Sequence, residues 1–120
     1  MAEKLTVIKV SGKILENPEG LKTFIKNLAK VEGKKLIIHS AAQLAKTVAG
    51  KMGVGISEVN ERPVIDDNAL KVYSMTYAGL VNKQLVAMLQ GRKYNALGLT
   101  GADMNVITST KQASDANGYT

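Results

Sequence analysis

The apolar positions of the chain fall into short continuous runs separated by stretches with helical spacing. Two runs rich in β-branched residues, Leu5–Val10 and Lys35–His39, predict two buried strands. Between them a helix is expected to begin at Asn17 and Pro18, because asparagine is a favoured N-cap and proline suits the first helical position. Gly33 is expected to end this helix. Its predicted apolar face consists of Leu21, Phe24, Ile25, Leu28 and Ala29.

A second helix is expected directly after the second strand. Ser40 and Gln43 match the capping box, in which two side chains bond backbone N–H groups at the start of a helix. Apolar residues continue at helical spacing from Leu44 to Met52, and Gly53 is expected to end the helix. The order strand, helix, strand, helix predicts an α/β fold with a parallel sheet and right-handed crossovers.

A loop and a long apolar helix are expected next. The loop holds a candidate short strand at Ile56–Val59, and Pro63 argues against regular structure through it. Asp66 or Asp67 can cap a helix that extends to about Gln90. So few charges lie along this helix that it is expected either to cross the sheet or to meet a partner chain.

The remaining segment predicts one more strand and a polar tail. Asn95–Leu99 is a short apolar run that predicts a third buried strand. Val106–Ser109 is a candidate partner for it after a turn at Gly101. Residues 111–120 contain no Leu, Ile, Val, Phe or Met, which predicts a loose tail or a loop cut off in mid-course.

The composition is that of an ordinary globular protein. The chain has 120 residues, 45% of them hydrophobic and 22% charged, which favours a single domain with a real core. It has no cysteine and one histidine, so disulfide scaffolds and metal motifs with two imidazoles are excluded and no metal site is expected. The longest apolar run, Leu85–Leu89, is too short to span a membrane, and no signal peptide is expected. These features predict a cytoplasmic protein.

The net charge of +6 is concentrated in the first half of the chain. Residues 1–60 hold ten basic and five acidic residues, whereas residues 61–120 hold six and five. Lys22, Lys26 and Lys30 follow one another at helical spacing and are interpreted as a solvated helix face. The uneven distribution argues against a nucleic-acid partner and is compatible with an anionic substrate.

Candidate chemistry lies in the two connections that follow the strands. In open parallel α/β sheets, ligands bind beyond the carboxyl ends of the strands, which here means residues 9–13 and 39–43. The second connection leads into a helix N-terminus, where free N–H groups and the helix dipole favour an anion. Lys9 adds a positive charge near the end of a strand, where it can stabilise a transferring phosphoryl group.

Each of these features also has a purely structural interpretation. Lys9 can serve solubility at a sheet edge, and Ser40 can cap a helix and do nothing more. His39 at a strand end is more often a hydrogen-bonded structural residue than an acid or a base. Asp66 and Asp67 before an apolar run more often cap a helix than form a catalytic pair. The glycine patterns of P-loop and dinucleotide-binding proteins are absent.

Five stretches, taken together, resemble the acetylglutamate kinases of the amino-acid kinase superfamily. The resemblance covers residues 5 to 110 with the motifs in the same order and spacing. In that family Leu36–His39 leads to a His-Gly-Gly-Gly loop, and Val59–Asn60 belongs to an Asn-Gly-x-Arg segment. The stretches are Val7–Leu15, Leu36–His39, Val59–Asn60, Ala78–Lys83 and Leu97–Asp103.

The resemblance implies a three-layer α/β/α sandwich around a mainly parallel sheet, of which residues 1–110 form the N-terminal, acyl-glutamate-binding lobe. It also implies ATP-dependent phosphorylation of the side-chain carboxylate of N-acetyl-L-glutamate, or of another N-acyl-glutamate, in arginine biosynthesis. The helix over residues 67–90 is implied to form a homodimer interface. No membrane partner is expected.

The resemblance also implies roles for individual residues. Lys9 corresponds to the lysine that stabilises the transferred phosphoryl group, and Ser11 and Gly12 correspond to a glycine turn that contacts phosphate. Ser40 is a candidate for the same contact. Three further residues are candidates for binding the acyl-glutamate: Ala41, Ala42 and Arg62.

The sequence departs from the family's pattern at these same sites. Ser11 stands where the family has glycine, and Ser40, Ala41 and Ala42 replace the three glycines of the second loop. A side chain at a glycine position of positive φ costs about 1–2 kcal/mol and takes up ligand space. Pro63 stands where the family has its substrate-binding arginine, so Arg62 can replace it only if the loop shifts by one residue.

The family's nucleotide site comes from a C-terminal half that is expected to follow about where this sequence ends. ATP and Mg²⁺ are implied as cofactors, but the residues that bind them are largely absent from these 120 residues. The chain alone is therefore expected to be inactive. The alternative is a non-catalytic module that keeps the fold and the dimer helix but has lost ligand binding.

Overall fold

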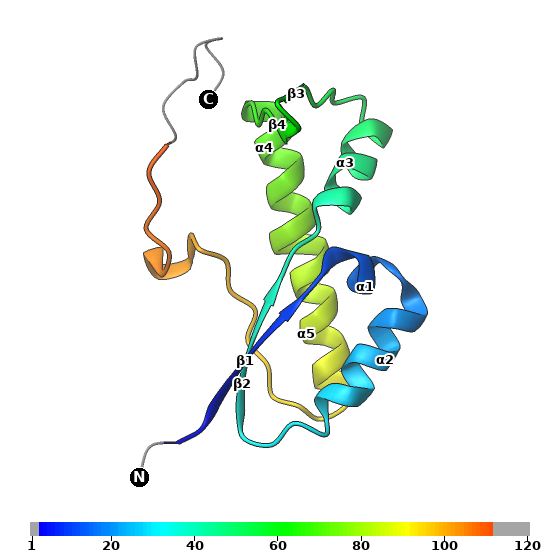
Figure 1. Ribbon diagram of the computed structural model, residues 1–120, viewed down its shortest axis with the longest axis vertical. Coiled ribbons are helices and arrows are strands. Elements are labelled where there is room, and N and C mark those ends of the chain that lie inside the picture. Colours follow the sequence, from blue (N-terminus) through cyan, green and yellow to red (C-terminus); the bar gives the residue numbers. More distant parts are fainter. Residues whose placement is uncertain (1–2, 112–120) are drawn as a thin grey trace.

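The computed structural model describes residues 3–111 and places a two-stranded parallel sheet at the centre (Figure 1). Strand β1 spans Leu5–Val10 and strand β2 spans Lys34–His39, in a register that pairs Leu5 with Lys34 and Val10 with His39. Both strands and their parallel pairing are confirmed, but the prediction that the strands are buried is wrong for one face, where Leu5, Val7, Leu36 and Ile38 are half exposed. Of the predicted tail, all but its first residue lies outside the described part of the chain.

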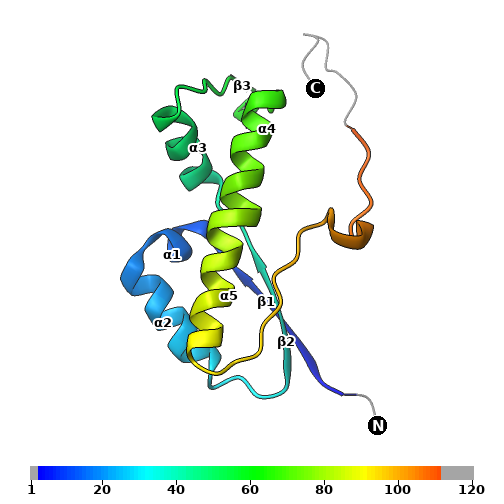
Figure 2. The ribbon, with the colours of Figure 1, turned by 180° about the vertical axis from the view of Figure 1, so that it is seen from behind.

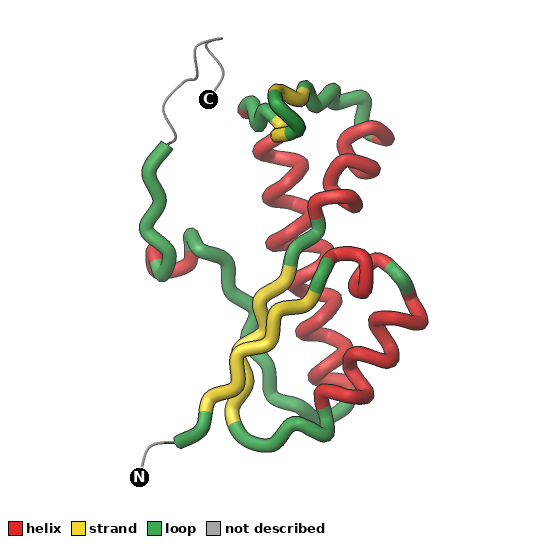
Figure 3. Tube along the Cα trace, viewed as in Figure 1, coloured by secondary structure: helices red, strands yellow, loops and turns green. Residues whose placement is uncertain are grey.

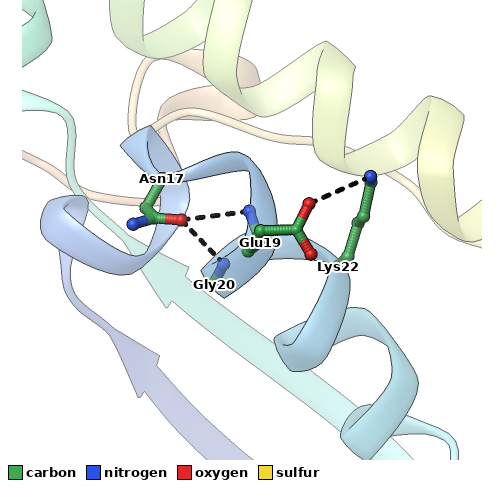
Figure 4. A network of polar contacts seen from close by, with 4 residues as sticks. All are labelled: Asn17, Glu19, Gly20 and Lys22. Carbon is green, nitrogen blue, oxygen red and sulfur yellow. Dashed lines mark hydrogen bonds and ion pairs between the residues drawn. The ribbon is translucent and has the colours of Figure 1, made fainter.

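The connection between the strands contains the expected helix, but the predicted stop at Gly33 is wrong, because the helix already ends at Leu28. Helix α2 spans Pro18–Leu28, and the Asn17 side chain accepts hydrogen bonds from the N–H groups of Glu19 and Gly20, each at 3.0 Å. Figure 4 shows this cap together with the ion pair between Glu19 and Lys22. The predicted cap and the proline at the first helical position are therefore confirmed.

A short helix that the apolar pattern does not predict precedes α2. Helix α1 spans Gly12–Glu16, so the expected turn at Ser11 and Gly12 is in fact the start of a helix. Leu15 is the buried residue of this helix and joins the core beside α2. Its two apolar residues, Ile14 and Leu15, are adjacent and show no helical period, which is why the apolar pattern does not reveal so short an element.

Helix α3 spans Ala42–Lys51, close to the predicted limits, but its start differs from the prediction. Ala41 is the N-cap residue and makes no side-chain hydrogen bond, so the predicted capping box of Ser40 and Gln43 is wrong. Gly53 has a positive φ of 71° just after the helix, as expected of a residue that ends one.

The segment after α3 forms a small hairpin, whose first strand lies within the predicted short strand at Ile56–Val59. Strands β3, Glu58–Val59, and β4, Arg62–Pro63, pair antiparallel, with Glu58 opposite Pro63. The prediction that Pro63 excludes regular structure is wrong, because proline is tolerated at the edge of a sheet. Asn60 and Glu61 connect the strands with φ of 49° and 62°, the backbone that a tight hairpin turn requires.

The long apolar helix is confirmed, with a change of helical type inside it. Helix α4 spans Asp67–Ser74, a π-helical stretch, η1, spans Met75–Val81, and helix α5 spans Asn82–Gly91. The Asp66 carboxylate accepts from the N–H of Ala69 at 2.8 Å, which confirms one of the two predicted caps. The stretch is only seven residues long and lies between two α-helices, so the apolar pattern does not reveal its wider turn.

The predicted third strand is absent from the part of the chain that the structure describes. Residues 94–100 form an extended connection, in which Leu97 is 83% exposed and pairs with no strand. The predicted pairing of Val106–Ser109 is also not formed. A short 3-10 helix, η2, spans Asp103–Asn105 between these segments. The short apolar run of residues 95–99 was compatible with a strand, but a strand also needs a neighbour whose backbone is free to pair with it.

The helices lie on one side of the sheet (Figures 1 and 3). β1 presents Ile8 and Val10 to these helices and leaves Leu5 and Val7 exposed, and β2 leaves Leu36 and Ile38 exposed. From behind, the connection that follows α5 passes along the strands (Figure 2). The core beneath the sheet consists of Val10, Leu15, Leu21, Ile25, Leu28, Ala41, Val81, Leu85 and Leu89.

This architecture confirms the α/β class with a parallel sheet. The described residues supply the sheet and one helical layer of the expected sandwich. Within residues 3–111, no helix combines the length and the apolar character needed to cross a membrane.

Candidate functional site

The loops that follow β1 and β2 meet at one edge of the sheet. The register that pairs Val10 with His39 brings Ser11 and Ser40 to the same end of the two strands. A Cβ atom placed on Gly12 would lie 3.4 Å from the Ser40 carbonyl oxygen and 3.5 Å from its hydroxyl. A Cβ at these distances would make ordinary contacts, so the spacing to Ser40 does not by itself demand glycine at position 12. The structure places Ser11, Gly12 and Ser40, the three residues predicted to contact phosphate, at the same edge of the sheet.

Lys9 lies one residue before the end of β1, opposite Ile38. Its side chain is exposed and lies on the same face as Leu5 and Val7, away from the helices. The strand fixes the backbone of Lys9 next to the two loops, while its flexible side chain leaves the ammonium free to follow a ligand. This placement is compatible with the predicted electrostatic role.

Glu16 is a member of this site that sequence reasoning missed. Its Oε1 atom accepts a hydrogen bond from the N–H of Leu44, in the first turn of α3, at 3.0 Å. The same oxygen lies 3.2 Å from the position of a Cβ on Gly12. A carboxylate of the chain itself therefore occupies the helix N-terminus that was predicted to attract an anion. No local pattern signals a contact across 28 positions.

The two alanines of the second loop have different surroundings. Ala41 is fully buried and belongs to the core, and its carbonyl accepts from the N–H of Ala45 at 2.9 Å. Ala42 is exposed at the first position of α3. Any contact between Ala41 and a ligand would therefore involve its backbone, because its methyl group faces the core.

Arg62 lies apart from the loops, on the β3–β4 hairpin (Figure 1). Its side chain is exposed, and within residues 3–111 no hydrogen bond or ion pair joins it to Lys9, Gly12 or Ser40. An ion pair between Lys46 of α3 and Glu58 of β3 holds the hairpin against α3. The structure thus links the hairpin to the helix that starts at the second loop.

A polar network connects the end of β2 to α5. The side-chain amide nitrogen of Asn82 lies 3.2 Å from His39 Nε2 and 3.2 Å from the Leu99 carbonyl oxygen. The Lys83 ammonium donates to Asn82 Oδ1 at 3.1 Å and to the Gly98 carbonyl at 2.9 Å. Burial lowers the pKa of His39 below its ordinary value. The sequence signal for this network was a polar Asn82 between the apolar Val81 and Leu85.

The described residues do not fit a Mg²⁺ or nucleotide site. Within them, no group of three or more His, Asp or Glu side chains lies close enough to hold a metal ion. Asp103 has a lowered pKa because its carboxylate accepts from the N–H and hydroxyl of Thr100. A hollow beside α4 is lined by Ile65–Asn68 and Lys111, and its two aspartates would repel the phosphates of a nucleotide.

Comparison with known proteins gives one family. The sequence model of the amino acid kinase family matches residues 4–119. The chain is 50% identical to the acetylglutamate kinase of Bacteroides fragilis over 112 residues, which cover 93% of this chain and 43% of the relative. It is 34% identical to the acetylglutamate kinase of Methanopyrus kandleri, over 95% of this chain and 44% of the relative.

A third relative, the acetylglutamate kinase of Bacteroides thetaiotaomicron, is 49% identical over 93% of this chain and 44% of its own length. The chain therefore spans less than half the length of the curated relatives that it matches. The family match covers nearly all of the sequence and agrees with the α/β fold. The chain belongs to the amino acid kinase family.

Proposed function

We propose that this chain carries the acyl-glutamate-binding part of a kinase that phosphorylates a carboxylate. The substrate is N-acetyl-L-glutamate or another N-acyl-glutamate, and the phosphoryl donor is ATP, in arginine biosynthesis. The relatives named acetylglutamate kinase support the substrate class. The observation that carries the proposal is the convergence of the two loops, in which a Cβ on Gly12 would lie 3.4 Å from the Ser40 carbonyl oxygen, one strand residue beyond Lys9 and Ile38.

The chain's own residues would bind and orient the acidic substrate. The Lys9 ammonium would face the oxygen atoms that gain negative charge during phosphoryl transfer. The N–H groups of Ser11, Gly12 and Ser40 would donate to phosphate or carboxylate oxygens. Ala41 and Ala42 would line the acyl-glutamate, and Arg62 would pair with one of its carboxylates if the hairpin closes toward the loops. Because the described residues do not fit a nucleotide site, we expect no turnover by this chain alone.

Calorimetric titration with N-acetyl-L-glutamate tests this proposal. The wild-type chain should release or absorb heat in a saturable way, and Lys9→Ala should weaken binding by about tenfold or more, since a charged hydrogen bond is lost. Lys26→Ala, which removes an exposed lysine from α2, is the matched control and should bind like the wild type. The absence of any heat at millimolar ligand would contradict an intact acyl-glutamate site.

A second candidate function is a non-catalytic module of the same fold. It is favoured by the Glu16 carboxylate at the start of α3, because this carboxylate already accepts from the Leu44 N–H and its charge would repel an anion there. Changing Ser11, Ser40, Ala41 and Ala42 to glycine distinguishes the two functions. If binding of N-acetyl-L-glutamate appears only in the glycine variant, the present site is disabled; no binding by either form argues against a kinase site.

We also propose a homodimer through the α4–η1–α5 helix. Leu70, Met75 and Leu80 are about half exposed on the side of this helix that faces away from the core. Burial of such side chains against a second copy would remove apolar area from water. In sedimentation experiments the wild type should then be a dimer, and Leu80→Lys should be a weaker dimer or a monomer. A monomeric wild type would contradict this proposal.

A further inference from the structure

The side-chain amide of Asn82 is the buried centre of the network that joins β2, α5 and the segment after α5. Asn82 is only 7% exposed, and four polar groups surround its amide. Two of them, the imidazole of His39 and the carbonyl of Leu99, lie next to the amide nitrogen. The Lys83 ammonium lies next to the amide oxygen. The backbone at Gly98 also approaches it, so closely that a Cβ there would lie 2.0 Å from Asn82 Oδ1.

The orientation of this amide follows from its unambiguous neighbours. The Leu99 carbonyl can only accept a hydrogen bond and the Lys83 ammonium can only donate one. The amide nitrogen must therefore face Leu99 and the amide oxygen must face Lys83. The opposite orientation would set two acceptors against each other on one side and two donors on the other. Because the nitrogen faces His39 as well, its second N–H points at His39 Nε2.

His39 Nε2 must then act as the acceptor. An imidazole that accepts at Nε2 is neutral and carries its proton on Nδ1. We propose that Asn82 is a positioning residue that holds His39 in the Nδ1–H form and thereby fixes the end of β2 and the Ser40–Ala42 loop. As far as the loop binds a ligand, this inference rests on the proposed function.

The surroundings of His39 agree with a neutral ring. β1 places the apolar Val10 opposite it, and the charged Lys83 of the same network bonds the Asn82 amide oxygen and the Gly98 carbonyl. Nδ1 is buried and has no partner among residues 3–111, so the Nδ1–H form leaves one donor unpaired, a cost that the contact between Nε2 and Asn82 must outweigh. Protonation of Nε2 would set a proton of the ring against an amide proton of Asn82 and break the contact. Acid should therefore weaken the link between Asn82 and the end of β2.

Nitrogen-15 NMR of the imidazole tests the inference, because His39 is the only histidine in the sequence. In the wild type at neutral pH, Nδ1 should resonate as a protonated nitrogen and Nε2 as an unprotonated one. In Asn82→Asp, the carboxylate should draw the proton to Nε2 and raise the pKa of His39 above that of the wild type. Asn27→Asp places the same charge on the exposed face of α2 and should change neither the position of the ring proton nor the pKa of His39. Lys83→Met should leave the Nδ1–H form in place.

A wild-type ring protonated on Nε2 at neutral pH would overturn the inference, even if every variant failed to fold. The same holds if Asn82→Asp folds and leaves the proton on Nδ1. Backbone amide shifts give the second readout: Asn82→Ala should move the signals of Ser40, Ala41 and Ala42, whereas Asn27→Ala should not. These measurements need no ligand. Failure to bind N-acetyl-L-glutamate with the Nδ1–H form intact would count against the proposed function alone.

Discussion

The Glu16 carboxylate accepts a hydrogen bond from the backbone N–H of Leu44 at 3.0 Å, and this contact joins α1 to α3. Each helix begins just after one of the two sheet-edge loops, at Gly12 and at Ala42. Glu16 therefore fixes the distance between the loops and places a negative charge at the start of α3, where the helix dipole favours it. The N-cap residue Ala41 provides no such group.

Removal of this contact should destabilise the fold. Glu16→Ala leaves the N–H of Leu44 without its acceptor, so the free energy of unfolding should fall by about 1 kcal/mol, within the range measured for lost helix caps. Glu16→Gln keeps an acceptor and should lose less. Denaturant unfolding measures both, and Glu32→Ala, at an exposed position, is the control. Equal stability of Glu16→Ala and the control would show that the contact contributes nothing.

The close approach of Gly98 to Asn82 predicts a steep cost for any side chain there. An alanine Cβ would overlap Asn82 Oδ1, so Gly98→Ala should lower the free energy of unfolding by about 1–3 kcal/mol. Gly50→Ala is the matched control for Gly98→Ala, because Gly50 lies in α3 and a Cβ there would meet nothing within 4 Å. It should stabilise the protein by up to about 1 kcal/mol. Thermal unfolding of the two variants should thus shift in opposite directions.

The one-sided burial of β1 predicts unequal effects of one substitution at two positions. Val10 is 4% exposed and packs in the core, whereas Val7 is 57% exposed on the open face. Val10→Ala should lower the free energy of unfolding by about 1–3 kcal/mol and Val7→Ala by about 0.5 kcal/mol. Denaturant unfolding of both variants measures the difference. Equal losses would mean that the face of β1 that carries Val7 is also covered in solution.

Stability should depend on pH through His39. Burial lowers the pKa of His39 in the folded chain, whereas the unfolded chain keeps a value near 6.5. Between the two values the unfolded state binds a proton that the folded state does not, so stability falls as the pH drops below about 6.5. The free energy of unfolding stops falling once the pH is below the pKa of His39 in the folded chain. Unfolding free energies at about pH 7.5 and 5.5 measure this, and His39→Gln should remove the difference. A wild type more stable at the lower pH would contradict the expected sign.

Features set by neighbouring residues could be predicted from the sequence. β1 and β2 follow from runs of β-branched residues, and the start of α2 follows from Asn17 and Pro18, whose geometry is decided within one turn. The meeting of the two loops also follows, because parallel strands end at the same edge of a sheet. Local chemistry therefore gave most of the fold and the location of the candidate site.

Features set by distant contacts could not be predicted. Ser40 fits a cap by its position, but Glu16 supplies the acceptor from another helix. The run at 95–99 resembles a strand, yet the carbonyls of Gly98 and Leu99 bond the side chains of Lys83 and Asn82 instead of a neighbouring strand. In both cases a tertiary partner decided the outcome, and an apolar period carries no information about such a partner.

The most direct test of the central claim is an NMR titration of the backbone amides with N-acetyl-L-glutamate. If the loops after β1 and β2 form the acyl-glutamate site, saturable shifts should appear at Gly12, Ser40 and Ala42 and spread to Arg62. The same residues should stay unshifted with a neutral ligand such as N-acetyl-alanine amide. The absence of saturable shifts at the two loops, or shifts confined to the hollow at Ile65–Asn68, would contradict the claim.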